Sequence, residues 1–114
     1  MSLKRILAYP FAYIVKLRND RWIKNPLKFQ KKTFHRLIET AKKTSFGIDH
    51  AFENIKTYED WKKNVPIRDY EGLKEYVDLV VDGKKDVLWP GKPQYFCKTS
   101  GTTSGAKYIP LTKD

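Results

Sequence analysis

Cysteine and histidine are scarce in this 114-residue sequence, which contains one cysteine, Cys97, and two histidines, His35 and His50. A single cysteine excludes an internal disulfide framework and suits a reducing compartment, so we expect a cytoplasmic protein. We interpret Cys97 as a small apolar residue buried in a strand, because free cysteines are among the most buried residues. No cysteine or acidic cluster stands at ligand spacing from either histidine, so no metal site is predicted and both histidines are interpreted as structural.

Long hydrophobic runs are lacking as well. The apolar run at residues 6–15 is about half the ~20 residues that a membrane-spanning helix requires, and Pro10 interrupts it. Basic residues precede the run as in a signal peptide, but no small-residue cleavage site follows it. We expect no transmembrane segment and interpret residues 1–24 as an N-terminal helix that packs on protein, with attachment to a membrane surface as the alternative.

Acidic residues are few in the first half of the chain. The formal net charge is +10, with 13 Lys/Arg against 4 Asp/Glu in residues 1–56 and 10 against 9 in residues 57–114. A basic excess favours either a solvated face or contact with an anionic partner. The alternative is therefore a small helical nucleic-acid-binding module that uses Lys28, Lys31, Lys32, Arg36, Lys42 and Lys43. These residues flank no recognised DNA- or RNA-binding motif, so no nucleic-acid partner is expected.

Apolar periodicity predicts a mainly α-helical chain with a short β-hairpin at its C-terminal end. We divide it into an N-terminal helix at 1–24, a helical region at 25–86 and a hairpin with a loop at 87–114. The first helix extends from about Leu3 to Trp22 and is bent or started at Pro10.

Capping residues mark the next helix, which begins at Asn25-Pro26. We expect Lys42 and Lys43 in its last turn and Gly47 as its left-handed C-cap.

Two further helices follow. Thr57 is predicted to cap a short helix that turns three residues inward: Tyr58, Trp61 and Val65. Asp69 is predicted to cap the next, which Gly83 closes.

In residues 99–110, several hydroxyl residues and two glycines precede a lysine. A β-prone segment lies on each side of this glycine- and hydroxyl-rich part. Glycines allow close backbone approach to an anion, and amides and hydroxyls supply donors. This composition favours a phosphate cradle as much as a flexible linker. The glycine spacing excludes a Walker loop and a dinucleotide fingerprint. The candidate phosphate-binding residues are Ser100, Gly101, Thr102, Thr103, Ser104, Gly105 and Lys107.

Five ordered blocks resemble the opening of the auxin-responsive promoter family of acyl-acid amido synthetases, which are adenylate-forming enzymes. The blocks are Phe46-Gly47-x-x-His50-x-Phe52, Tyr58-Glu59-Asp60-Trp61, Val65-Pro66-Ile67-x-Asp69-Tyr70-Glu71, Val87-Leu88-Trp89-Pro90-Gly91 and Thr99-Ser100-Gly101-Thr102-Thr103-Ser104-Gly105-x-Lys107-Tyr108-Ile109-Pro110.

The resemblance implies ATP and Mg²⁺ as cofactors, with a carboxylic acid and an amine or amino acid as substrates. The acid would be activated as an acyl-adenylate with release of pyrophosphate, and the amine would then displace AMP. The loop at residues 100–105 would hold the β- and γ-phosphates of ATP, while Lys107 would either reach phosphate or fix the following strand. Another adenylate-forming ligase, similar to acyl-CoA synthetases, is the alternative.

The resemblance also implies that residues 1–114 are the N-terminal, incomplete part of a large ATP-binding domain in a larger α/β enzyme. Because the adenine and ribose contacts of the family would lie further along, we expect the 114-residue chain alone to be inactive. Catalytic residues are not assigned. The check is pyrophosphate exchange with ATP and a panel of carboxylic acids, in which exchange by the isolated chain would contradict the expectation.

Overall fold

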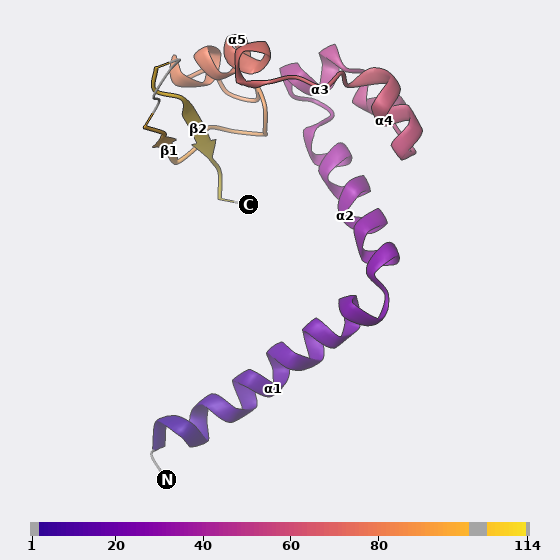
Figure 1. The fold of residues 1–114 in the computed structure, drawn as a ribbon, viewed down its shortest axis with the longest axis vertical. Coiled ribbons are helices and arrows are strands. Elements are labelled where there is room, and N and C mark those ends of the chain that lie inside the picture. The colour runs from indigo at the N-terminus through magenta and orange to yellow at the C-terminus, as the bar shows by residue number, and fades with distance from the viewer. Residues whose placement is uncertain (1–2, 101–104, 114) are drawn as a thin grey trace. The chain divides into compact units, whose positions relative to one another are not determined.

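The computed structural model describes residues 3–100 and 105–113 and is mainly helical, with one antiparallel hairpin, as predicted (Figure 1). Its elements are α1 (Leu3–Lys24), α2 (Pro26–Ala41), α3 (Ser45–Asp49), the 3-10 turn η1 (Phe52–Asn54), α4 (Tyr58–Asn64), α5 (Tyr70–Val81), β1 (Tyr95–Lys98) and β2 (Tyr108–Leu111). The chain forms two compact units, residues 1–35 and 36–114. The division of the chain into segments 1–24, 25–86 and 87–114 stays a prediction.

The unit of residues 1–35 consists of α1 and the first turns of α2. Helix α1 begins at Leu3 and contains Pro10, so it does not start at the proline. None of the described helices has both the length and the apolarity to cross a membrane. Helix α2 begins at Pro26 as predicted, and the Asn25 carbonyl accepts a hydrogen bond from the Phe29 amide at 3.2 Å.

The end of α2 differs from the prediction. The helix stops at Ala41, so Lys42 and Lys43 follow its last turn instead of lying in it. Gly47 is not a left-handed cap but a buried residue inside α3. A Cβ atom on Gly47 would lie 2.1 Å from the Ala41 carbonyl oxygen, so the position requires glycine for close backbone approach.

Thr44 makes the sharp connection between α2 and α3. Its hydroxyl donates to the Ala41 carbonyl at 2.7 Å and accepts from the Gly47 amide at 3.0 Å. One buried side chain thereby satisfies a carbonyl at the end of one helix and an amide at the start of the next. Because Thr44 makes this connection, Gly47 lies inside α3 instead of capping α2.

The core of residues 36–114 is small and joins segments that are distant in sequence. Its buried apolar residues are Ile38, Ala41, Phe52, Ile55, Val77, Val80 and Val87. The Phe46 ring extends this core, since it stacks on His50 with centroids 4.0 Å apart and meets Tyr76 edge-on at 5.1 Å. Aromatic contacts of this geometry stabilise a fold beyond the area they bury.

His50 is 4% exposed and is held on both ring nitrogens. Nε2 lies 3.0 Å from an Arg68 guanidinium nitrogen, which only donates, so Nε2 accepts. Nδ1 then carries the proton and donates to the Phe46 carbonyl at 2.9 Å. His50 therefore joins α3 to the segment before α5.

Tyr76 ties α5 to α3 through its hydroxyl, which donates to Asp49 at 2.8 Å. Burial, and next the hydrogen bond to Asp49, raise the pKa of the Tyr76 hydroxyl above its usual value. The hydroxyl therefore remains a donor throughout the neutral range.

The helix starts at α4 and α5 are capped as predicted. Thr57 and Asp60 form a capping box, and the Asp69 carboxylate accepts from the Gly72 amide at 2.9 Å. The prediction that Tyr58 points inward is wrong: it is 64% exposed, and its ring lies 5.1 Å from the Lys62 ammonium. Tyr58 is the first residue of a seven-residue helix, which is too short to turn its whole apolar set toward one core.

We expect Gly47→Ala to lower the free energy of unfolding by about 1–3 kcal/mol, because the new methyl group would collide with the Ala41 backbone. Gly72→Ala is the matched control. The three nearest atoms to its Cβ would belong to side chains, those of Arg68 at 3.1 and 3.4 Å and of Asp69 at 3.5 Å, so its effect should stay within about 1 kcal/mol. Urea denaturation of both variants checks this, and equal midpoints would contradict the steric role of Gly47.

Candidate functional site

The candidate site is the mouth of the β1–β2 hairpin, where the loop of residues 99–107 leaves and rejoins the strands. The strands pair antiparallel, with Lys98 opposite Tyr108 as the last pair. Beyond it, the Thr99 amide donates to the Lys107 carbonyl at 3.0 Å, and the Lys107 amide donates to the Thr99 hydroxyl at 3.3 Å. The two ends of the loop are therefore fixed next to each other.

Four of the seven candidate residues, Gly101, Thr102, Thr103 and Ser104, lie outside the described residues. The other three stand at the two ends of the loop: Ser100 and Gly105 are exposed, and Lys107 is partly buried. Gly105 has φ +78°, a conformation that favours glycine, and among the described residues no atom beyond its chain neighbours lies within 4 Å of where its Cβ would be. The loop thus returns to β2 through an open, left-handed glycine.

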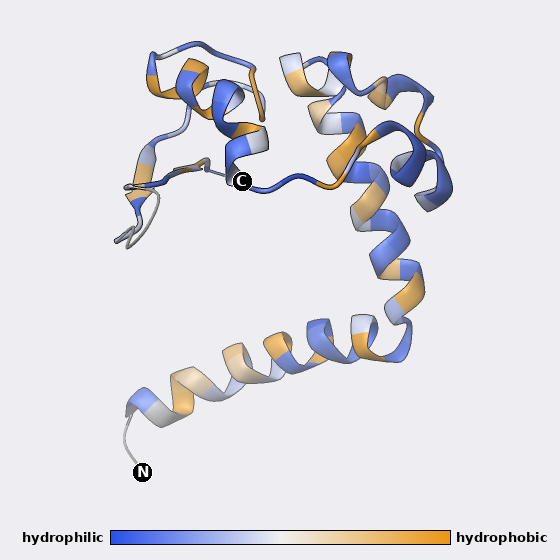
Figure 2. Ribbon diagram, turned by 45° about the horizontal axis from the view of Figure 1, so that its top comes forward, coloured by the Kyte–Doolittle hydropathy of each residue, from blue (hydrophilic) through white to orange (hydrophobic). Residues whose placement is uncertain are grey.

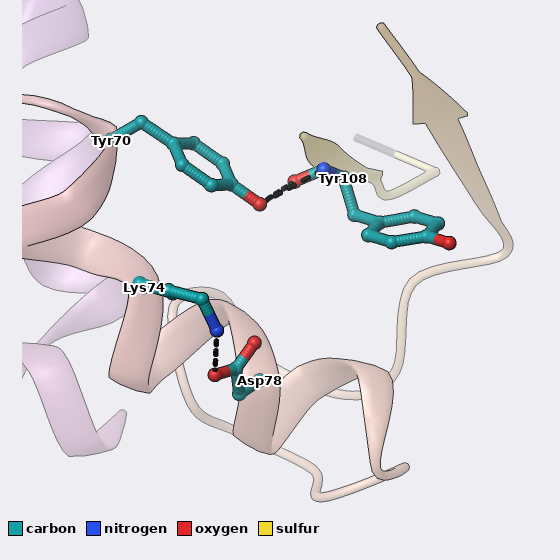
Figure 3. A network of polar contacts seen from close by, with 4 residues as sticks. All are labelled: Tyr70, Lys74, Asp78 and Tyr108. Carbon is teal, nitrogen blue, oxygen red and sulfur yellow. Dashed lines mark hydrogen bonds and ion pairs between the residues drawn. The ribbon is translucent and has the colours of Figure 1, made fainter. Parts of the chain in front are cut away.

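Tyr70 fixes the start of β2 to the start of α5. Its hydroxyl accepts a hydrogen bond from the Tyr108 amide at 2.9 Å and donates to the Tyr108 carbonyl at 3.4 Å. Figure 3 shows the Tyr70 side chain reaching from the helix to the Tyr108 backbone. One hydroxyl therefore serves both backbone groups of the residue that follows Lys107.

Two lysines at the mouth lie against aromatic rings. The Lys107 ammonium is 5.3 Å from the centroid of the Tyr70 ring, and the Lys98 ammonium is 5.9 Å from that of Tyr108. Neither lysine is ion-paired with a carboxylate of the described residues. Because a ring face holds a cation without neutralising its charge, both lysines remain available to an anion.

The donors at this mouth fit a polyphosphate. Lys98 and Lys107 supply positive charge, Ser100 supplies an exposed hydroxyl, and Gly105 leaves its backbone open. This set favours an anion, since ammonium and amide groups only donate hydrogen bonds. The phosphate-binding roles of these residues stay a prediction.

The sequence pattern missed two parts of this arrangement, Tyr70 and Lys98. Tyr70 is the first residue of α5, and its contact with the Tyr108 backbone joins positions 38 residues apart, so no local repeat indicates it. Lys98 could have been identified by pairing the two predicted strands, because their register places Lys98 opposite Tyr108, next to the loop.

Cys97 is exposed, so the prediction that it is buried is wrong. It lies in a two-stranded hairpin opposite Ile109, which is itself 47% exposed. Alternation along a strand buries a residue only where a second layer covers that face, and no described element covers this one.

An open, largely apolar cavity of about 370 Å³ lies beside the hairpin. It is lined by residues from the end of α2, from α5, from the segment after α5, from β2 and from just after β2: Arg36, Leu37, Val80, Val87, Leu88, Trp89, Gly91, Pro93, Pro110 and Thr112. The candidate phosphate-binding residues that the structure describes, Ser100, Gly105 and Lys107, do not line it.

Comparison with known proteins agrees with the sequence resemblance. Residues 18–114 match the model of the GH3 family N-terminal domain. The chain is 38% identical over 58 residues to an indole-3-acetic acid-amido synthetase, GH3.15, of Arabidopsis thaliana, covering 49% of this chain and 10% of the relative. It is 46% identical over 48 residues to a 4-substituted benzoates-glutamate ligase, GH3.12, of the same plant, covering 41% and 8%. No solved structure matches. The chain spans about a tenth of the length of these relatives.

We expect Tyr70→Phe to lower the free energy of unfolding by about 0.5–1.5 kcal/mol, because it removes the hydroxyl that binds Tyr108 and keeps the ring. The Tyr108 amide should also exchange its hydrogen faster. Tyr95→Phe is the control, since Tyr95 is 70% exposed and its hydroxyl makes no hydrogen bond to the described residues. Unchanged exchange at Tyr108 would show that the hydroxyl does not hold the strand.

Proposed function

This chain belongs to the GH3 family, and we propose that it supplies the ATP-phosphate loop of an acyl-acid amido synthetase. The observation that carries the proposal is the hairpin mouth, where two lysines that pair with no carboxylate of the described residues flank a loop of glycine and hydroxyl residues. In the proposed reaction a carboxylate attacks the α-phosphorus of ATP, which yields an acyl-adenylate and pyrophosphate. An amine then attacks the acyl carbon and releases AMP, which leaves an amide.

The substrate class follows from the printed names of the two relatives. One is a synthetase for amides of indole-3-acetic acid, and the other joins 4-substituted benzoates to glutamate. Both act on carboxylic acids that carry an aromatic group. The carboxylic acid is the feature that both names share, and the second name adds an amino acid as the acceptor. We propose a carboxylic acid and an amino-acid acceptor for this chain.

The proposed role of the loop is to position the β- and γ-phosphates and balance their charge. Lys107 lies directly before β2 with its ammonium beside the Tyr70 ring, and Ser100 is exposed at the other end of the loop. The residues between them, Gly101 to Ser104, would add amide and hydroxyl donors. Phosphoryl chemistry depends mostly on such positioning and charge stabilisation, to which Mg²⁺ would add positive charge.

Rigid attachment of the loop ends supports this role. Donors lower a barrier most when they are already oriented before the reaction, because no reorganisation is then needed. The Thr99–Lys107 hydrogen bonds and the Tyr70 hydroxyl hold the two ends of the loop in place, which supports such an orientation. The loop can then carry small residues that leave room for phosphate oxygens.

We expect Lys107→Ala to reduce acid-dependent ATP–pyrophosphate exchange by the native protein that carries this chain, roughly 10²–10³-fold, the effect of losing one preorganised donor. Lys113→Ala is the control, because Lys113 is an exposed lysine beyond β2 and should leave exchange unchanged. Thermal unfolding of both variants should stay close to wild type. Full exchange by folded Lys107→Ala would refute the phosphate role of Lys107.

The acyl product separates the two classes of ligase. Formation of a thioester in place of an amide would favour an acyl-CoA synthetase.

A further inference from the structure

Tyr70 contacts two neighbouring residues with different parts of its side chain. Its hydroxyl binds the Tyr108 backbone at 2.9 and 3.4 Å, and its ring centroid lies 5.3 Å from the Lys107 ammonium. The first contact sets the position of a strand, whereas the second acts on a charged group of the candidate phosphate site. Substitutions that remove the hydroxyl alone, or the hydroxyl together with the ring, therefore separate the two effects.

The backbone that carries the Tyr70 ring is anchored in the helical core. Tyr70 is the first residue of α5, and the Asp69 carboxylate caps this helix start by accepting from the Gly72 amide at 2.9 Å. Helix α5 carries both polar and apolar residues (Figure 2), and it buries Val77 and Val80. The ring thus reaches the hairpin from a helix that is fixed at its start by a cap and further along by packing.

The two lysines of the hairpin mouth lie on opposite faces of the strands. Lys98 is paired with Tyr108, and paired residues share a face. Lys107 directly precedes Tyr108, and the strand ladder continues to it because the Thr99 amide donates to the Lys107 carbonyl at 3.0 Å. Since successive residues of an extended strand alternate between faces, Lys107 lies on the face opposite to Lys98. Lys107 therefore meets a ring from α5, whereas Lys98 meets the Tyr108 ring of the hairpin itself.

A ring that already holds an ammonium lowers the free-energy cost of binding an anion. A lysine side chain has many rotamers, and restricting them opposes binding. The contact with the Tyr70 ring restricts the Lys107 side chain before any phosphate arrives. Because an ammonium has three N–H donors, contact with one ring face leaves donors for a phosphate oxygen.

We propose that Tyr70 is a positioning residue for ATP, and that its ring acts through Lys107 by holding the ammonium ready for the β- and γ-phosphates. This role depends on the proposed function, since it requires that Lys107 contacts ATP. The hydroxyl of Tyr70 serves the attachment of β2, and the ring serves the binding and activation of ATP. Lys98, on the other face, acts independently of Tyr70.

The test compares Tyr70→Phe, which keeps the ring, with Tyr70→Leu, which removes it, in the native protein that carries this chain. Both variants lose the hydroxyl, so the ratio of their activities reports the ring. In acid-dependent ATP–pyrophosphate exchange, kcat/KM for MgATP should be roughly 2- to 30-fold lower for Tyr70→Leu, the range of a contact between a cation and a ring. The KM for the carboxylic acid should be equal in the two variants, whereas a general loosening of the fold would change it too.

The same comparison in two lysine backgrounds shows whether the ring acts through Lys107. With Lys107→Ala, the two Tyr70 variants should differ less than about 2-fold, because no ammonium remains for the ring to hold. Lys98→Ala is the matched background and should leave the full ratio in place, since Lys98 contacts the Tyr108 ring instead. Tyr70→Met is a second ring-free variant that should repeat the result of Tyr70→Leu, and thermal unfolding shows which variants are folded.

Two results would overturn the positioning role of the Tyr70 ring. One is equal exchange by the ring-keeping and ring-free variants when Lys107 is present, and the other is an unchanged ratio in the Lys107→Ala background. Both leave the phosphate role of Lys107 intact, because Lys107→Ala alone tests that role. Full exchange by Lys107→Ala alone would contradict the proposed function, and the positioning role with it.

Discussion

Two backbone hydrogen bonds at the start of α3 hold the helical part of residues 36–114 together. The Ser45 amide donates to the Asp86 carbonyl at 2.8 Å, and the Phe46 amide donates to the Val87 carbonyl at 3.0 Å. First-turn amides have no partner within their own helix, so α3 requires an outside acceptor, and the chain after α5 provides it. Val87 is only 1% exposed as a result, and the path of the chain toward the hairpin is set at this point.

Tyr70 provides the second attachment, between the helices and the hairpin. A two-stranded hairpin is only marginally stable by itself, so a bond from a packed helix to the first residue of β2 contributes strongly to its order. Tyr70 acts at the residue adjacent to Lys107 and places its own ring beside the Lys107 ammonium. Strand attachment and the orientation of a charged group are thus coupled in one side chain.

Local chemistry in the sequence was sufficient for α1, the start of α2, α4, α5, the caps at Thr57 and Asp69, and the hairpin, because each depends on residues within a few positions of one another. Helix α3 was missed, and two errors arise where the local pattern does not show what surrounds a residue. Gly47 was predicted to be a cap because the sequence does not show how closely it approaches the Ala41 backbone. Cys97 was predicted to be buried because strand alternation does not reveal whether a second layer covers the strand. The family came from ordered motifs, whereas the Tyr70 contact became visible only when α5 and β2 were placed together.

The central claim is that the hairpin mouth binds polyphosphate through the loop between Thr99 and Lys107. The most direct measurement is amide NMR of the chain during titration with magnesium triphosphate. The account predicts saturable shifts at Ser100, Gly105 and Lys107, with none at the exposed lysines of the turn after α5, Lys84 and Lys85. Shifts of equal size at Lys84 and Lys85, or none at the loop, would contradict it, because binding would then follow net positive charge instead of the geometry of the site.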